Sequence, residues 1–198
     1  MTVLTAHVSS NASCFASILD LYVATGARVL DATYGRGAFW AAIDRAKYRL
    51  VTNDIGTPAD CAADFRKLPF EAAAFDVVVL DPPYMHSGGS IKRSLDKCYR
   101  NGERGGSWRD VLPMYLDGAK EARRVLVDGG LLILKTQDTV VNHRQFYLHA
   151  HLLDLPGFLA EDLFVVVQRG RPLMSGKWKR QYHARKNHSY FLIHRKRA

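Results

Sequence analysis

A run of apolar residues that ends in an acid, two prolines and a tyrosine constrains this chain more than any other feature. The run is Phe75–Leu80, and it leads directly into Asp81-Pro82-Pro83-Tyr84. A short apolar run rich in β-branched residues predicts a buried strand. The prolines have no backbone N–H, fix φ and keep the preceding residues extended, so the chain leaves the strand stiffly. We therefore expect the Asp81 carboxylate and the Pro82 carbonyl to be available as acceptors, with the Tyr84 ring nearby.

Two acceptors beside an aromatic ring match a flat heterocycle that carries an exocyclic amine. The acceptors would bind the two amine protons and orient the nitrogen lone pair, while the ring stacks on the heterocycle. A plain turn is the alternative, because Asp-Pro is common in loops. The whole set of four residues after a buried strand favours chemistry, so the predicted catalytic residues are Asp81, Pro82, Pro83 and Tyr84.

Strands and helices alternate along the rest of the chain, and the last two strands follow each other without a helix. The predicted strands are 28–31, 49–53, 76–80, 131–134, 163–168 and 190–194, with a short strand end at 64–65 and a turn at 128–130. The predicted helices are 11–25, 38–47, about 107–127 and 143–153. This order predicts an α/β fold with a mostly parallel sheet and an antiparallel C-terminal hairpin. The length of 198 residues suits a single domain, 1–198.

Acidic side chains follow several of the predicted strands. In open parallel sheets, ligands bind beyond the carboxyl ends of the strands. Side-chain packing does not explain a row of carboxylates at that edge, so we expect them to belong to a ligand site. They are Asp31, Asp54, Asp64, Asp81 and Asp138.

A glycine turn follows the first of these strands and indicates where a cofactor binds. Gly35 and Gly37 flank Arg36 between a predicted strand and a predicted helix, where the backbone can approach a ligand closely. Asp31 would suit a ligand with a positively charged amino group, and Asp54 could accept hydrogen bonds from a ribose diol. S-adenosylmethionine carries an ammonium, a ribose and an adenine. The predicted cofactor-binding residues are Asp31, Ala32, Thr33, Gly35, Gly37, Asp54, Asp64 and Phe65.

A nicotinamide dinucleotide and a purely structural turn are the alternatives for this site. The third glycine position of the dinucleotide fingerprint is occupied by Trp40, and Asp31 would repel a pyrophosphate. A glycine turn that only helps helix–strand packing stays open as an interpretation.

The charge of the chain is concentrated in its C-terminal part. The net charge is +9 and the isoelectric point is about 9.6. No acidic residue follows Asp162, whereas Arg169 to Arg197 contain ten of the 28 basic residues. The remaining 18 basic residues lie among 19 acidic ones in the first 168 residues. A one-sided basic surface favours a polyanion such as nucleic acid, with a solubility tail or a membrane-surface patch as alternatives.

The composition gives no sign of a disulfide framework, a membrane span or a metal centre. Cys14, Cys61 and Cys98 are widely spaced, as is typical of reduced thiols in a cytoplasmic protein. No apolar run reaches the ~20 residues that a transmembrane helix needs. The eight histidines show no ligand spacing beside a third donor, so no metal is expected.

Two motifs together give the chain a resemblance to a known family. The segment 31–37 and the segment 81–84 resemble those of the amino-methyltransferases, which methylate N6 of adenine or N4 of cytosine in DNA. The stretches 135–138 and 183–190 are similar to those of small phage and mobile-element DNA methylases, and the resemblance covers roughly residues 26 to 195. It implies a seven-stranded Rossmann-like sheet, S-adenosylmethionine as methyl donor and a flipped target base. Ala32-Thr33 stand where the family has Pro-Phe, and a separate target-recognition domain is missing.

Basic loops could take over the role of that recognition domain. The segments are about 85–109 and 169–188, and Trp178 lies among lysines and arginines that could bind phosphates while the indole stacks on a base. An exposed, solvated hairpin is the alternative. The predicted nucleic-acid contacts are Lys92, Arg93, Arg100, Lys177, Trp178, Lys179, Arg180, Arg185 and Lys186.

The sequence therefore predicts methylation of an exocyclic base amine, with N6 of adenine in DNA favoured over N4 of cytosine. An RNA methyltransferase acting on N6 of adenine or N2 of guanine stays open. So does a nucleic-acid-binding protein that has lost catalysis. A homodimer is also left open, because a small methylase without a recognition domain could need two chains to cover its DNA.

Overall fold

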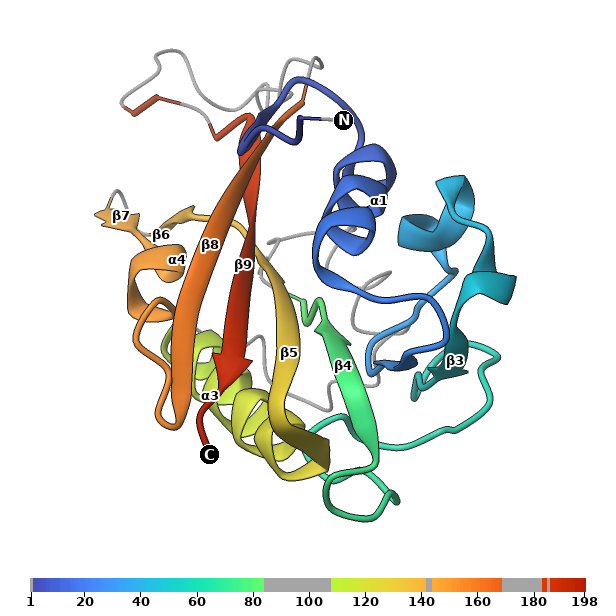
Figure 1. The fold of residues 1–198 in the computed structure, drawn as a ribbon. Helices are drawn as coiled ribbons and strands as arrows, with labels where there is room; N and C mark the ends of the chain where they lie inside the picture. Colours follow the sequence, from blue (N-terminus) through green and yellow to red (C-terminus); the bar gives the residue numbers. More distant parts are fainter. Residues whose placement is uncertain (1, 84–107, 142–143, 169–182, 185) are drawn as a thin grey trace.

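The structure, a computed structural model, describes residues 2–83, 108–141, 144–168, 183–184 and 186–198 (Figure 1). Two short 3₁₀ segments, η1 and η2, accompany the α-helices. The helical segments are α1 (Asn11–Tyr22), η1 (Ala38–Ala42), η2 (Arg45–Lys47), α3 (Trp108–Val125) and α4 (Leu148–His151). The strands are β1 (Ala6–His7), β2 (Arg28–Asp31), β3 (Arg49–Thr52), β4 (Phe75–Leu80), β5 (Leu126–Thr136), β6 (Thr139–Val141), β7 (Arg144–Phe146), β8 (Phe158–Val167) and β9 (His188–Lys196).

A seven-stranded, mostly parallel sheet forms the centre of the fold, with strand order β1-β8-β9-β5-β4-β2-β3. β9 lies between β5 and β8 and is antiparallel to both, whereas the other neighbouring pairs are parallel. The predicted mostly parallel sheet with an antiparallel C-terminal hairpin is thus confirmed. A second, two-stranded antiparallel sheet is formed by β6 and β7.

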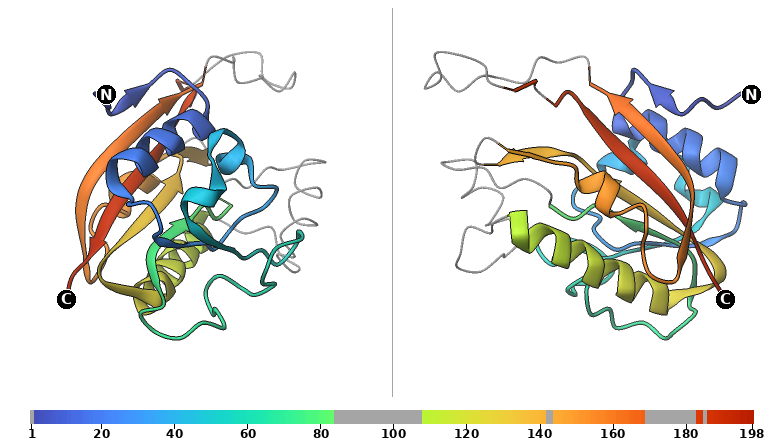
Figure 2. Two further views of the ribbon diagram at one scale, coloured as in Figure 1. Left: turned by 45° about the vertical axis from the view of Figure 1, so that its right-hand side comes forward. Right: turned by 90° about the vertical axis from the view of Figure 1, so that its left-hand side faces the viewer.

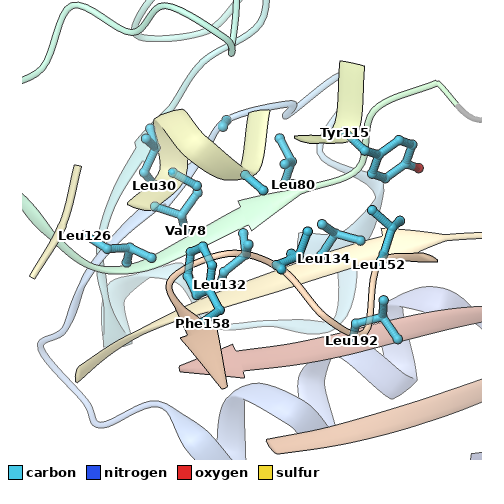
Figure 3. Close-up of a cluster of buried hydrophobic side chains, with 14 of the residues drawn as sticks. Leu30, Val78, Leu80, Tyr115, Leu126, Leu132, Leu134, Leu152, Phe158 and Leu192 are labelled. Carbon is cyan, nitrogen blue, oxygen red and sulfur yellow. The ribbon is translucent and has the colours of Figure 1, made fainter. Parts of the chain in front are cut away.

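The sheet is covered on both faces, which produces two separate hydrophobic cores (Figure 2). α1 and η1 pack on one face, where Phe15 lies against Trp40 and Phe191. α3 and the segment after α4 pack on the other face, and Figure 3 shows Leu134 and Leu152 at the Tyr115 end of that cluster. The near-continuous burial of β4 and β5 explains why their sequences read as unbroken apolar runs.

α1 shows how the local sequence sets an element. The Ser10 hydroxyl accepts a hydrogen bond from the Ser13 N–H and caps the first turn. The buried residues of the helix recur at helical spacing, which fixes the face that it presents to the sheet. The helix ends at Tyr22, three residues before the predicted end, because Val23 is already extended.

Two predicted helices are wrong in extent. Residues 38–47 form η1 and η2 in place of one helix, since Ile43 between them is extended and Asp44 caps the next turn by accepting from the Ala46 N–H. Of the helix predicted over 143–153, only α4 is helical. The chain before it forms the β6–β7 hairpin, in which the β-branched Thr139–Val141 segment favours a strand.

Three smaller predictions also need correction. The turn predicted at 128–130 lies inside β5, where the register against β4 shifts and Gly129 has a φ of 75°. No strand ends at Asp64, because the chain there is irregular and only Cys61 forms an isolated bridge with Asn53. β1 was not predicted, and it pairs with β8 through Ala6 and His7.

None of the helices in the described ranges is long and apolar enough to cross a membrane.

Leu132→Ala should lower the free energy of unfolding by about 2–5 kcal/mol, because Leu132 is fully buried in β5 and its truncation leaves a cavity. Leu159→Ala is the matched control. Leu159 is half exposed on β8, so its truncation should change stability by no more than about 0.5 kcal/mol. Urea denaturation followed by circular dichroism measures both, and equal losses in the two variants would contradict the assignment of the core.

Candidate functional site

The glycine turn after β2 is held in place by the carboxylate at the end of β3. Gly35 and Gly37 have φ values of 56° and 70°, which side chains other than glycine rarely adopt. Asp54 accepts hydrogen bonds from the backbone N–H groups of Gly35, Gly56 and Thr57 at 2.7–2.8 Å. Three predicted cofactor residues therefore meet at this edge of the sheet. Asp54 binds the turn itself, a role that its position in the sequence does not reveal.

The Asp31 carboxylate also forms hydrogen bonds with nearby residues of the same chain segment. Its carboxylate accepts from the Trp40 indole N–H at 2.7 Å and from the Thr33 N–H at 3.2 Å, and the residue is 3% exposed. Burial raises the pKa of Asp31 to about 7, the two hydrogen bonds oppose that shift, and the nearby Asp81 and Asp54 carboxylates add to it. Trp40 is thus the main partner of Asp31. In the sequence, Trp40 was notable only because it occupies the third glycine position of the dinucleotide fingerprint.

A pocket opens where these turns meet. Its empty volume is about 560 Å³, a figure that includes space open to solvent. Five of the eight predicted cofactor residues line it, whereas Asp31, Gly35 and Gly37 do not. Pro83 of the proline motif also reaches the pocket. The lining residues are Ala32, Thr33, Asn53, Asp54, Ile55, Ala63, Asp64, Phe65, Arg66, Pro83 and Met114.

Asp64 and Phe65 lie on the wall of this pocket beside Arg66. The Arg66 guanidinium forms an ion pair with Asp64 at 2.6 Å and lies 5.9 Å from the centroid of the Phe65 ring. This ion pair lowers the pKa of Asp64. Gly118 of α3 leaves space for the Phe65 ring, since a Cβ there would lie 2.7 Å from it.

Asp81 joins the proline motif to the cofactor-side turn. Its N–H donates to the Thr33 hydroxyl at 2.7 Å, so the ends of β2 and β4 are connected directly. The Oδ1 atom of Asp81 is buried and has no hydrogen-bond partner among the described residues. Burial raises the pKa of this carboxyl to about 6, and the Lys135 ammonium opposes the shift. An acceptor without a donor inside a protein is costly, and a ligand that donates to it would remove that cost.

Two residues that the sequence did not single out support the motif. The Tyr115 hydroxyl of α3 lies 3.2 Å from the Pro82 carbonyl and 3.0 Å from the Lys135 carbonyl, where it can donate to either. Lys135 is 1% exposed, and its ammonium lies 5.2 Å from the centroid of the Phe191 ring. Burial lowers its pKa to about 8, and Asp81 opposes that shift. A lysine inside an apolar strand is the one sequence signal that could have identified Lys135.

Most of the predicted nucleic-acid contacts cannot be placed. Tyr84 and the residues Lys92, Arg93, Arg100, Lys177, Trp178, Lys179, Arg180 and Arg185 lie outside the described residues. So do nearly all of the segments 85–109 and 169–188. Lys186 is described, and its ammonium lies 5.2 Å from the centroid of the Tyr147 ring.

Comparisons with known proteins identify the fold through solved structures. No protein-family model and no curated protein matches the sequence. A putative methyltransferase from Bacillus halodurans is 15% identical, with a TM-score of 0.57 over 94% of this chain and 100% of that chain. The 1,6-didemethyltoxoflavin-N1-methyltransferase of Burkholderia thailandensis, solved with S-adenosylhomocysteine, is 16% identical, with a TM-score of 0.58 over 96% and 79%.

TrmN from Thermus thermophilus is 18% identical, with a TM-score of 0.54 over 93% of this chain and 48% of that chain. The present chain therefore spans about half the length of TrmN. At these identities the similarity concerns the fold alone. The chain has the Rossmann-like fold of S-adenosylmethionine-dependent methyltransferases.

Stability should depend on pH through the buried carboxyls. The pKa of Asp31 is about 7 in the folded state, against about 4 in an unfolded chain. Between these values the folded state binds a proton that the unfolded state has lost, so the free energy of unfolding falls as pH rises from about 4 to about 7.

Asp31→Asn should make this decline shallower, because the amide does not titrate and can still accept from Trp40. Urea denaturation of the wild type and the variant from pH 4 to pH 8 measures the difference. Parallel curves for the two proteins would show that Asp31 titrates as it does in the unfolded chain.

Proposed function

We propose that this chain, acting as a single domain, transfers a methyl group from S-adenosylmethionine to an exocyclic amine of a nucleic-acid base. The observation that carries the proposal is Asp81, whose buried Oδ1 has no partner in the described part of the chain and belongs to the same motif as Pro83 on the pocket wall. The methyltransferase fold supports the transfer reaction. The basic charge after Asp162 supports a polyanionic substrate.

The pocket residues fit the cofactor. Asp54 could accept a hydrogen bond from a ribose hydroxyl through a lone pair that its three backbone donors leave unused, since a carboxylate offers about four such positions. Phe65 offers a ring face to an adenine, and Thr33 lies between this pocket and Asp81. When bound, S-adenosylmethionine supplies an electrophilic methyl group on a sulfonium.

The proline motif would hold the amine for attack. The Asp81 carboxylate and the Pro82 carbonyl accept from the two N–H groups of the amine, which directs the nitrogen lone pair to the methyl carbon. The new C–N bond forms as the methyl–sulfur bond breaks, and one amine proton then leaves to water. The Asp81 carboxylate stabilises the positive charge that develops on nitrogen, and positioning of the two reactants supplies much of the rate. The Tyr115 hydroxyl, which can donate to the Pro82 carbonyl or to the Lys135 carbonyl, would help to keep the Pro82 carbonyl in place.

The proposed target is N6 of adenine in DNA. The adenine would leave the duplex stack to enter the active site. The test is incubation with methyl-labelled S-adenosylmethionine and DNA or RNA, followed by digestion to nucleosides and chromatography. Label in N6-methyldeoxyadenosine is the expected result. Label only in RNA nucleosides would move the target to RNA, and no label in any nucleoside would overturn the proposal.

Asp81→Ala should reduce the methylation rate at least 100-fold, because the variant loses the acceptor that stabilises charge on the amine. The affinity for S-adenosylmethionine, measured by isothermal titration calorimetry, should stay within a few-fold of the wild type. Wild-type turnover in this variant would contradict the role of Asp81.

Gly118→Ala should weaken S-adenosylmethionine binding, because the added Cβ would displace the Phe65 ring from the pocket wall. Alanine favours a helix over glycine by about 1 kcal/mol, so a loss of binding would not reflect a weakened α3. Phe65→Leu alone is the comparison, because it removes the aromatic face and should also weaken binding, without any overlap at Gly118. An unchanged affinity in Gly118→Ala would show that Phe65 does not contact the cofactor.

A further inference from the structure

A group of hydrogen-bonded polar side chains lies beside the proline motif and has no part in the chemistry described so far. Asp138 follows the carboxyl end of β5, Tyr190 lies near the start of β9, and His149 lies in α4. Asp138 is 3% exposed and accepts from His149 Nδ1 at 2.6 Å and from the Tyr190 hydroxyl at 3.2 Å. The His149 and Tyr190 rings are stacked, with their centroids 4.2 Å apart.

The direction of these hydrogen bonds determines what His149 offers to a ligand. Because Tyr190 donates its only proton to Asp138, its oxygen accepts from His188 Nε2, which lies 2.9 Å away. His149 Nδ1 likewise donates to Asp138, so Nε2 is the ring nitrogen available to a ligand. The carboxylate below and the Tyr190 ring beside it hold the imidazole in one orientation, as partners of functional histidines commonly do.

Tyr147 lies next to this imidazole and is exposed to solvent. Its side chain is 51% exposed, and its ring meets the His149 ring edge to face with 6.4 Å between centroids. The Lys186 ammonium, brought from the basic C-terminal part of the chain, lies over the Tyr147 ring, 5.2 Å from its centroid. Proteins bind unstacked bases by combining exposed aromatic rings with nearby cations that bind the phosphates.

These side chains lie at the same end of the sheet as Asp81. Tyr190 pairs with Thr136 of β5, and Lys135 is joined to Pro82 through the Tyr115 hydroxyl. Leu152, directly after α4, is buried in the same core as Tyr115 (Figure 3). Figure 1 shows the β6–β7 hairpin after the carboxyl end of β5 and α4 next to this hairpin, both on the opposite side of β4 from β3.

We propose that Tyr147, His149 and Lys186 form a subsite for the nucleotide that neighbours the target base in the substrate strand. The base takes the place of the Lys186 ammonium on the Tyr147 ring, Lys186 then binds the phosphate, and His149 Nε2 forms a hydrogen bond with the nucleotide. This inference rests on the proposed function, and it assigns a substrate contact to residues of the described structure outside the proline motif.

The physical reason for such a subsite is the cost of taking the target base out of the stack. Extrusion uncovers one face of the adjacent base. A tyrosine ring that covers this face recovers part of the lost stacking without reading the sequence, since every base presents a π face. A buried Asp138 that fixes His149 prepares the contact before the substrate arrives.

The test uses the full chain and a short fluorescein-labelled single-stranded DNA of mixed sequence, whose bases are already unstacked. Fluorescence anisotropy should show a loss of roughly tenfold in affinity for Tyr147→Leu, whereas Tyr147→Phe keeps the stacking ring and binds like the wild type. Lys186→Gln should reduce the slope of log K against log[salt] by about one, as removal of one phosphate contact requires. Leu159→Ala, exposed at the other end of the sheet, is the surface control.

The outcomes separate this inference from the proposed function. Full affinity in Tyr147→Leu, together with methylation of nucleic acid by the wild type, overturns the subsite alone. Equal losses in Tyr147→Phe and Tyr147→Leu overturn stacking as its basis. A wild type that neither binds nor methylates nucleic acid overturns both. Urea denaturation and S-adenosylmethionine affinity should be unchanged in Tyr147→Leu, and a loss of either would assign the ring a structural role.

Discussion

The structure depends on keeping several carboxylates together at the carboxyl edge of a parallel sheet. β2, β3 and β4 run in register, so the acids that follow them converge by geometry. Each is accommodated differently. Asp54 is stabilised by backbone donors, Asp31 by the Trp40 indole N–H and a raised pKa, and the ionised form of Asp81 by the charge of Lys135. Of these three carboxylates, Asp81 has a buried oxygen to which no described residue donates, so it is the acceptor left for a substrate.

That arrangement divides the edge of the sheet into two halves that meet at β4. The half over β2 and β3 is built from backbone turns that surround a pocket. Such a rigid site suits a cofactor, which is the same in every reaction cycle. The half over β5 and β9 is built from side chains, with the Asp138 and Tyr190 hydrogen bonds at its base. The Thr33 hydroxyl joins Asp81 to the first half, and the Tyr115 hydroxyl joins Pro82 to the second. The proline motif is therefore fixed from both sides before either ligand binds.

The sequence predicted the parts of this structure that follow from local patterns. Buried strands read as apolar runs, and the acids at their ends lie together because parallel strands share an edge. What it missed depends on contacts between distant segments. Trp40 looks like an ordinary core residue until its indole N–H meets Asp31, and Tyr115 looks like one more core residue of α3 until its hydroxyl meets the Pro82 carbonyl. The pairing of Lys186 with Tyr147 joins residues 39 positions apart, which no local pattern could reveal.

Lys135 bears on whether this edge is arranged for stability or for chemistry. Its ammonium is buried on the α1 face of the sheet, near Phe191, while the four residues before it in β5 are apolar. Removing a cation and a carboxylate from water costs several kcal/mol per ion, and apolar residues of similar size often stabilise a fold as well or better. A buried ammonium whose charge acts on Asp81 is therefore not what packing alone would select. The Lys135 ammonium favours the ionised form of Asp81. This helps Asp81 to bind an amine substrate, because a protonated carboxyl stabilises the developing positive charge less well.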